Sequence, residues 1–110
     1  MNNTNITHDF DIIELLKSKN LSLEELGLYG MLWAISDKSL ILHNITELAK
    51  LGNCGTDKVS GLIKKLIEKK LLIEWRITQR IYFFRILSPD EDYNTAKMEF
   101  KNGSYISQQN

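Results

Sequence analysis

The sequence predicts an α+β domain in which a core of three helices precedes a two-stranded β-hairpin, with extra helices at both ends. Three observations predict this class. Two long stretches carry apolar side chains at helical spacing, a tight turn of Asn53, Cys54 and Gly55 separates two helical segments, and residues 80–87 form a strongly β-prone run. The 110 residues suffice for one such domain with a buried core.

The first elements are helices that lead to a short strand. A helix is expected over about 9–19, and Ser22 then lies three residues before Glu25, which is the capping-box spacing. This pair predicts the start of a second helix that runs to about residue 36. The apolar run at 40–42 is too short for a helix and predicts a small strand.

A pair of helices joined by the tight turn follows the strand. Asn44 or Thr46 caps a brief helix through Leu51, and Thr56 is expected to cap the next helix, over about 57–70. The apolar positions of this longer helix follow the helical repeat: Val59, Leu62, Ile63 and Leu66. One side of it is therefore expected to be buried and the other exposed.

The last third predicts a hairpin and a final helix. Residues 71–77 and 80–87 read as its strands, with a two-residue turn at Thr78 and Gln79. Ser88 and Pro89 have the pattern of a helix start, so a helix is expected over about 89–101. The domain is expected to span 9–101, with disordered segments at 1–8 and 102–110.

Composition excludes several classes of protein. No apolar run reaches about 18 residues, so no membrane partner is expected. A single cysteine and a start without a signal-peptide pattern predict a cytoplasmic location. One cysteine and two distant histidines cannot by themselves form a zinc site, so no metal or other cofactor is expected. No catalytic motif is present, so we expect no catalytic residue and no enzyme activity.

The neutral chain has a strongly uneven charge distribution. Residues 1–49 carry seven acidic and three basic side chains, a net charge of −4. Residues 50–89 carry nine basic and three acidic side chains, a net charge of +6, and residues 90–110 have a net charge of −2. The basic block can be the footprint of an anionic ligand, or it can be an ordinary solvated lysine-rich surface.

The order of elements and three sequence segments resemble the winged helix-turn-helix superfamily over about residues 21–88. The segments are TELAKL at 46–51, TDKVS at 56–60 and IKKLIEKKLL at 63–72, with a small turn between the first two. The resemblance implies a DNA-binding fold in which the second helix of the pair enters the major groove and the hairpin forms a wing.

One segment of the sequence suggests a closer group within that superfamily, and two residues depart from the superfamily's usual pattern. Residues 21–23 leading to 27–29 are similar to replication-initiator-like winged-helix proteins of plasmids and phages. Lys70 stands where the superfamily usually has a glycine after the recognition helix, so this helix exit needs a strained lysine or a different ending. Gly61 stands where relatives often have a long polar side chain, which weakens base reading by this helix.

The resemblance implies two sets of DNA-binding residues. Those of the recognition helix are Thr56, Lys58, Ser60, Gly61, Lys64 and Lys65. Those of the wing are Arg76, Thr78, Gln79 and Arg80. Lysines mostly bind phosphates, whereas arginine and glutamine can read guanine and adenine, so we expect the wing to contribute as much specificity as the helix. The alternative is a solvent-facing lysine helix and a polar turn.

Two functions fit these features. The first is sequence-specific binding of double-stranded DNA by site occupancy, as a plasmid or phage origin factor, a conjugative-transfer accessory factor or a transcription regulator. The alternative is a winged-helix protein–protein interaction module, such as a phage inhibitor or adaptor, without DNA binding. A homodimer through the terminal helices can accompany either function, with an interface of Ile12, Ile13, Leu16, Tyr93 and Phe100; these side chains can equally cover the domain's own core.

Overall fold

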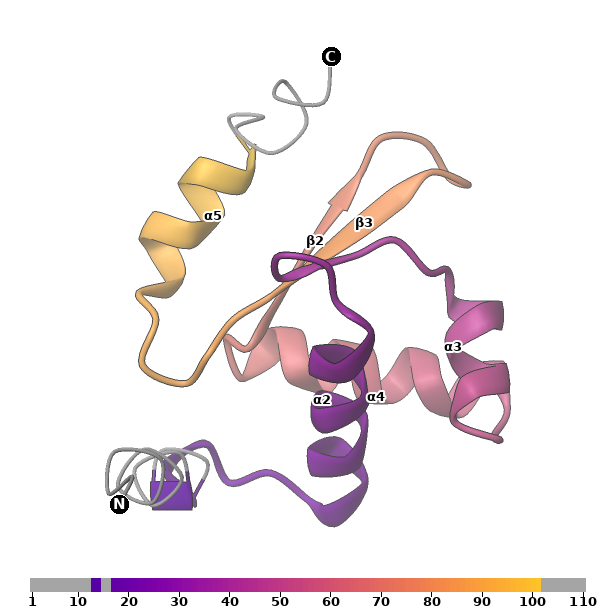
Figure 1. Ribbon diagram of the computed structural model, residues 1–110, viewed down its shortest axis with the longest axis horizontal. Coiled ribbons are helices and arrows are strands. Elements are labelled where there is room, and N and C mark those ends of the chain that lie inside the picture. The colour runs from indigo at the N-terminus through magenta and orange to yellow at the C-terminus, as the bar shows by residue number, and fades with distance from the viewer. Residues whose placement is uncertain (1–12, 15–16, 102–110) are drawn as a thin grey trace, which may run out of the picture.

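A computed structural model of the protein describes residues 13–14 and 17–101 and confirms the α+β class. The elements, in chain order, are α2 (Leu23–Ile35), β1 (Leu40–Ile41), α3 (Ile45–Leu51), α4 (Thr56–Glu68), β2 (Leu72–Arg76), β3 (Tyr82–Ile86) and α5 (Tyr93–Lys101). The strands form an antiparallel sheet in the order β1-β3-β2. Figure 1 shows α2, α3 and α4 on one side of this sheet and α5 on the other.

The helix starts follow from local hydrogen bonds. The Ser22 hydroxyl accepts from the backbone N–H of Glu25, whose carboxylate accepts from the backbone N–H of Ser22, so the predicted capping box is confirmed. Asn44 and Glu47 form a second capping box at α3, which selects Asn44 over Thr46 as its cap. Before α2, the chain turns at Asn20 with a φ of 58°, a left-handed conformation that asparagine tolerates.

The limits of α4 differ from the prediction. Its N-cap is Gly55, which has no side chain to form a cap, and Thr56 is the first helical residue. The helix ends at Glu68, and Lys70 then adopts a φ of 62°. The exit therefore uses a left-handed lysine where a glycine would be unstrained. The backbone N–H groups of Lys70 and Leu71 still find the carbonyls of Ile67 and Leu66, which fixes the turn into β2.

The hairpin loop is longer than predicted. Register pairs Arg76 with Tyr82, so β3 begins at Tyr82 and the loop comprises residues 77–81. The Ile81 carbonyl accepts from the backbone N–H groups of both Ile77 and Thr78. A two-residue turn needs residues that accept positive φ, and the sequence here has no glycine or asparagine. The longer loop satisfies its backbone groups without one.

The main core lies between the three helices and one face of the sheet. It is built from the apolar sides of α2, α3 and α4 together with inward-facing strand residues: Leu28, Tyr29, Leu32, Ile41, Leu48, Ala49, Val59, Ile63, Leu66, Leu71, Leu72, Phe84 and Ile86. The Tyr29 hydroxyl donates to the Leu87 carbonyl at 2.6 Å, which fixes α2 to the end of β3. Trp33, by contrast, is 36% exposed, and its ring contacts Tyr29 edge-on.

A smaller core lies on the other face of the sheet, under α5. Phe100 is 1% exposed and contacts Trp75 edge-on at 5.4 Å between ring centroids. Phe83 and Tyr93 pack against the same cluster. Phe100 is therefore buried within its own chain and is not free for a dimer interface. Of the other predicted interface residues, Ile13 is exposed, whereas Ile12 and Leu16 lie outside the described residues, as do the segments 1–8 and 102–110.

The start of α5 also differs from the prediction. The helix starts at Tyr93, not near Pro89, because the Asp92 carboxylate accepts the backbone N–H of Thr95 and its carbonyl accepts that of Ala96. Residues 88–92 form a separate turn in which the Ser88 backbone and hydroxyl both donate to the Glu91 carboxylate.

Candidate nucleic-acid interface

Helix α4 presents a polar outer face opposite its buried residues. Val59, Ile63 and Leu66 face the core, which leaves Gly61, Lys64 and Lys65 exposed on the other side. Neither lysine forms an ion pair with any residue that the structure describes. Two predicted basic residues therefore share an exposed helix face with their ammonium groups available to an anion. Acidic Asp57 and Glu68 flank this face at its two ends, and both are exposed.

The structure places Lys58 differently from the other predicted residues of α4. Its ammonium group pairs with the Glu24 carboxylate at the start of α2, and this hydrogen bond is the main cause that raises the pKa of Lys58. Lys58 thus leans toward α2, away from the outer face of its own helix. Ser60 is half-buried beside the outer face, and Thr56 is exposed in the first turn.

A shallow hollow of about 480 Å³ lies between α3 and the start of α4. Its polar rim is formed by Thr46, Lys50, Asn53 and Thr56. Because Gly55 provides no side-chain cap, the first N–H groups of α4 face this region without a side-chain partner from the N-cap residue. The sequence did not predict Thr46, Lys50 or Asn53 as binding residues. The signal was present in the turn itself, which brings the ends of two helices together.

The hairpin tip carries the predicted arginines in two different roles. Arg76 stacks on the Tyr82 ring at 4.4 Å from its centroid, donates to the Gln79 carbonyl at 2.9 Å and pairs with Glu74 at 2.9 Å. Three contacts therefore hold Arg76 within the hairpin. Arg80 is exposed, and its guanidinium has no ion pair among the described residues.

The remaining tip residues shape the loop. The Thr78 hydroxyl accepts from the backbone N–H groups of Arg80 and Ile81, at 3.2 and 3.0 Å. Through its carbonyl, Gln79 fixes Arg76, and its own side chain is exposed. Thr78 therefore orders the backbone of the tip, while Gln79 and Arg80 present their side chains to solvent. Arg85, the third arginine of the hairpin, is buried and pairs with Glu91, so it takes no part in this surface.

The hairpin is attached to α3 through Tyr82. The Tyr82 hydroxyl accepts the first backbone N–H of α3, from Ile45, at 3.0 Å, while its ring carries the Arg76 guanidinium. This chain of contacts fixes the base of the loop relative to the α3–α4 pair. In Figure 1 the hairpin tip and the α3–α4 turn both lie toward the right of the view, and α5 lies toward the left.

The other end of α4 is attached to α2. Lys69 pairs with Glu25 at 2.5 Å and also donates to the Asn20 carbonyl at 2.8 Å. The hydrogen bond from Lys69 is the main cause that lowers the pKa of Glu25. Contacts with α2 are therefore made near both ends of α4, by Lys58 in its first turn and by Lys69 just after its last residue.

Other kinds of site are sparse in the described part of the chain. No three His, Cys, Asp or Glu side chains gather there in a way that could hold a metal ion. Among the same residues, no helix has the length and apolar character needed to cross a membrane.

Comparisons with known proteins bear on the fold. No protein-family model matches the sequence, and no curated protein matches it significantly. The crystal structure of RV1404 from Mycobacterium tuberculosis is similar to this chain with a TM-score of 0.52 and 13% sequence identity, covering 98% of this chain and 77% of RV1404. At this identity the likeness concerns the arrangement of helices and strands alone.

Proposed function

We propose that this chain is a winged helix-turn-helix protein that binds double-stranded DNA sequence-specifically. In this proposal α3 and α4 form the helix-turn-helix and the β2–β3 hairpin forms the wing. The chain acts by occupying its site, as a plasmid or phage origin factor, a conjugative-transfer accessory factor or a transcription regulator. The observation that carries the proposal is the set of three exposed basic side chains, Lys64, Lys65 and Arg80, that have no ion pair within the described residues.

The outer face of α4 suits the major groove. B-DNA admits an α-helix there, and lysines on such a helix neutralise the phosphates that border the groove. Lys64 and Lys65 take this role, and Ser60 is the candidate for contact with a base edge. At Gly61 a Cβ atom would meet nothing within 4 Å, so the protein itself does not require glycine there. A close approach of the α4 backbone to DNA supplies a reason for it.

Within the wing, Arg80 is the candidate for reading bases or a narrow minor groove. Arginine binds guanine with two hydrogen bonds and is attracted to the negative potential of a narrow minor groove. Arg76 acts through the shape of the loop, because the Tyr82 ring and the Gln79 carbonyl hold its guanidinium against the hairpin. Of the two predicted wing arginines, Arg80 is thus the one expected to touch DNA.

The test begins with fragmented DNA from the source of the protein. The full chain is incubated with these fragments at moderate salt, and the retained DNA is sequenced. We expect one short region to be enriched. On that region the logarithm of affinity should fall with the logarithm of salt concentration, with a slope of roughly 0.9 for each phosphate neutralised. An inverted repeat in it would favour a regulator, and directly repeated boxes an origin or transfer factor.

A second function has its own supporting observation. Leu23 is 84% exposed and Leu26 40% exposed on the outside of α2, in line with the exposed Trp33. An apolar exposed helix face is typical of a protein–protein contact. If no fragment is enriched, or all are retained equally, the DNA proposal is wrong and an interaction module that uses α2 becomes the better explanation.

A further inference from the structure

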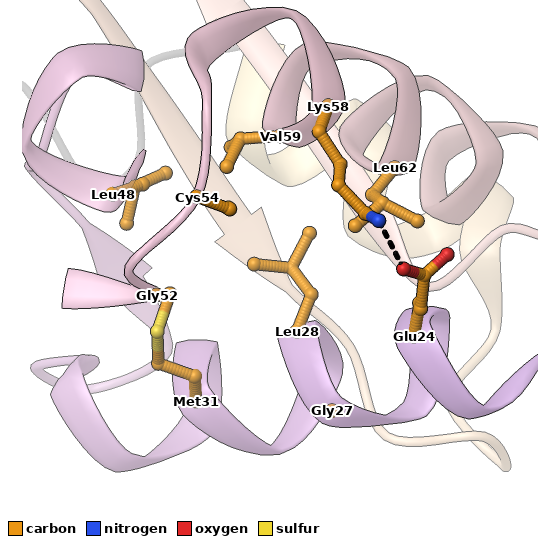
Figure 2. Close-up of a pocket in the computed structure, with 10 residues that line it drawn as sticks. All are labelled: Glu24, Gly27, Leu28, Met31, Leu48, Gly52, Cys54, Lys58, Val59 and Leu62. Atoms are coloured by element: carbon orange, nitrogen blue, oxygen red, sulfur yellow. Dashed lines mark ion pairs between the residues drawn. The ribbon is translucent and has the colours of Figure 1, made fainter. Parts of the chain in front are cut away.

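A second hollow lies behind α4, on the side that faces α2. It is a pocket of about 360 Å³ between α2, the α3–α4 turn and the first turns of α4. Figure 2 shows Leu28 and Met31 entering it from α2, Leu48 from α3, and Lys58 and Leu62 from α4. None of the uses of α4 and the hairpin described above involves this space. Its volume lies within the range of small-molecule sites.

The walls of the pocket are aliphatic. Leu28, Leu48 and Val59 are buried core residues whose side chains line it, and no aromatic ring does. Met31 adds a flexible thioether, whose sulfur would lie 3.9 Å from a Cβ atom at Gly52. Unbranched hydrocarbon fits such walls, and each methylene buried between them contributes favourably to binding.

A glycine, Gly27, lies at the edge of the pocket. Gly27 lines the pocket on α2, and a Cβ atom at this position would meet nothing within 4 Å. The same is true of Gly30, one turn further along α2, which does not line the pocket. Because Gly27 lines the pocket and Gly30 does not, a leucine at position 27 would stand at the edge of the pocket and one at position 30 outside it. The helix thus offers a variant and a matched control.

The polar end of the pocket holds one cation, the ammonium group of Lys58. Glu24 and Lys58 form its ion pair, and both side chains are more than half exposed, so the pair exchanges partners at little cost. Glu24 lies in the first turn of α2 and Lys58 in that of α4. The positive end of a helix dipole stabilises a carboxylate and disfavours an ammonium group. When the pair separates, the Glu24 carboxylate stays at the favourable end of α2, and a ligand carboxylate can take its place beside the Lys58 ammonium.

We infer that this pocket binds a medium-chain aliphatic carboxylate, with its hydrocarbon chain between Leu28, Met31 and Leu48 and its carboxylate on the Lys58 ammonium. The ligand takes the place of Glu24 at Lys58, and Glu24 turns into water. This inference goes beyond the proposed function and does not depend on it, because ligand binding can be measured without DNA.

The test is a titration of the full chain with octanoate, observed by NMR at isotope-labelled methionine methyl groups. Met31 lines the pocket, whereas Met98 is 65% exposed on α5 and serves as the internal control. We expect a saturable shift of the Met31 signal with no shift at Met98. Butyrate, which has four fewer methylenes, should bind at least roughly tenfold more weakly. Neutral octanol should bind about two- to fivefold more weakly, because the ammonium group that holds the carboxylate is more than half exposed.

Two variants locate the site. Gly27→Leu should abolish the Met31 response to octanoate, whereas Gly30→Leu should leave it unchanged, and thermal unfolding confirms that both fold. Lys58→Gln should reduce octanoate affinity to about that of octanol. Absence of a saturable shift at Met31, or equal loss in both glycine variants, overturns the inference. Equal binding of octanoate and octanol overturns the assignment of the carboxylate to Lys58.

Discussion

Helices α2 and α4 both have 13 residues, yet they divide their surfaces in opposite ways. α4 has a buried apolar side and a polar outer side, where Lys64 and Lys65 form no ion pair with the residues that the structure describes. α2 is apolar on its inner side and also on much of its outer side, where Leu23, Leu26 and Trp33 are exposed. The apolar repeat alone identifies α4 as a surface helix. A helix like α2, with apolar side chains on both sides, is expected to be covered by other parts of a protein. The outer face of α4 thus suits water and anions, and that of α2 suits an apolar contact.

The largest expected effect is a difference in stability between substitutions on the inner and outer sides of α2. Leu32 is fully buried, so Leu32→Ala should lower the free energy of unfolding by about 2–5 kcal/mol through lost burial and the cavity left behind. Leu23→Ala, at an exposed position of the same helix, should change it by less than about 0.5 kcal/mol. Urea unfolding of both variants measures this. Similar losses in the two variants would mean that the outer face of α2 is covered in the free protein.

The next effect concerns the outer face of α4. The double variant Lys64→Glu and Lys65→Glu should lower affinity for the enriched DNA by roughly tenfold or more and reduce the salt slope by about 1.8. Its control reverses Lys17 and Lys38, two exposed lysines away from α4, with the same change of net charge. Fluorescence anisotropy over a series of salt concentrations measures both. An equal loss in the control would show that only net charge matters and not the α4 face.

The contact between the two helices predicts a dependence on pH. The pKa of Glu25 is lowered in the folded chain, first by its hydrogen bond from Lys69, so its stabilising contribution is present above the ordinary value of 4.5 and is lost as pH falls through the lowered value. Glu25→Gln should therefore cost about 1–2 kcal/mol of stability at neutral pH and progressively less as pH falls below 4.5. Urea unfolding at neutral pH and at a series of acidic pH values measures the difference. The exposed Glu24→Gln is the matched control, and a pH-independent cost for Glu25→Gln would contradict this account.

The smallest expected change in stability comes from replacing one exposed glycine in each of the two helices. Gly61→Ala in α4 and Gly30→Ala in α2 should each raise stability by about 0.5–1 kcal/mol, because a Cβ atom meets nothing at either position and alanine favours helix. Only Gly61→Ala should also weaken binding to the enriched DNA, if the α4 backbone approaches it closely. Thermal unfolding and anisotropy together separate the two quantities. Unchanged DNA affinity in Gly61→Ala would remove the backbone contact from the proposal.

Patterns among residues close together in the sequence were sufficient to predict much of the fold. The capping box of Ser22 and Glu25 and the apolar repeat of α4 each depend on residues three or four positions apart, so they are legible without the rest of the chain. The α5 start was wrong because Ser88 and Pro89 have a helix-start pattern, while the hydrogen bonds of Asp92 determine the actual beginning. Two local patterns competed there, and the packing of Phe100 under the sheet favours the second.

The candidate site was predictable in composition and not in arrangement. The sequence identified Lys58, Lys64 and Lys65 as one set, but the structure separates Lys58, whose partner Glu24 is far away along the chain. It likewise grouped Arg76 with Arg80, although the Tyr82 ring and the Gln79 carbonyl hold only Arg76. Charge and spacing do not reveal which cations already have partners, because those partners come from other elements.

By itself, the sequence determined the α+β class, the order of the elements and the buried side of α4, since helix caps and side-chain periodicity are local properties. The tertiary structure alone decided that Trp75 and Phe83 are covered by α5 of their own chain, that Lys69 fastens α4 to α2, and that a pocket remains between these helices. These features depend on how two surfaces meet, and the space left between close-packed side chains is determined only when both surfaces are in place.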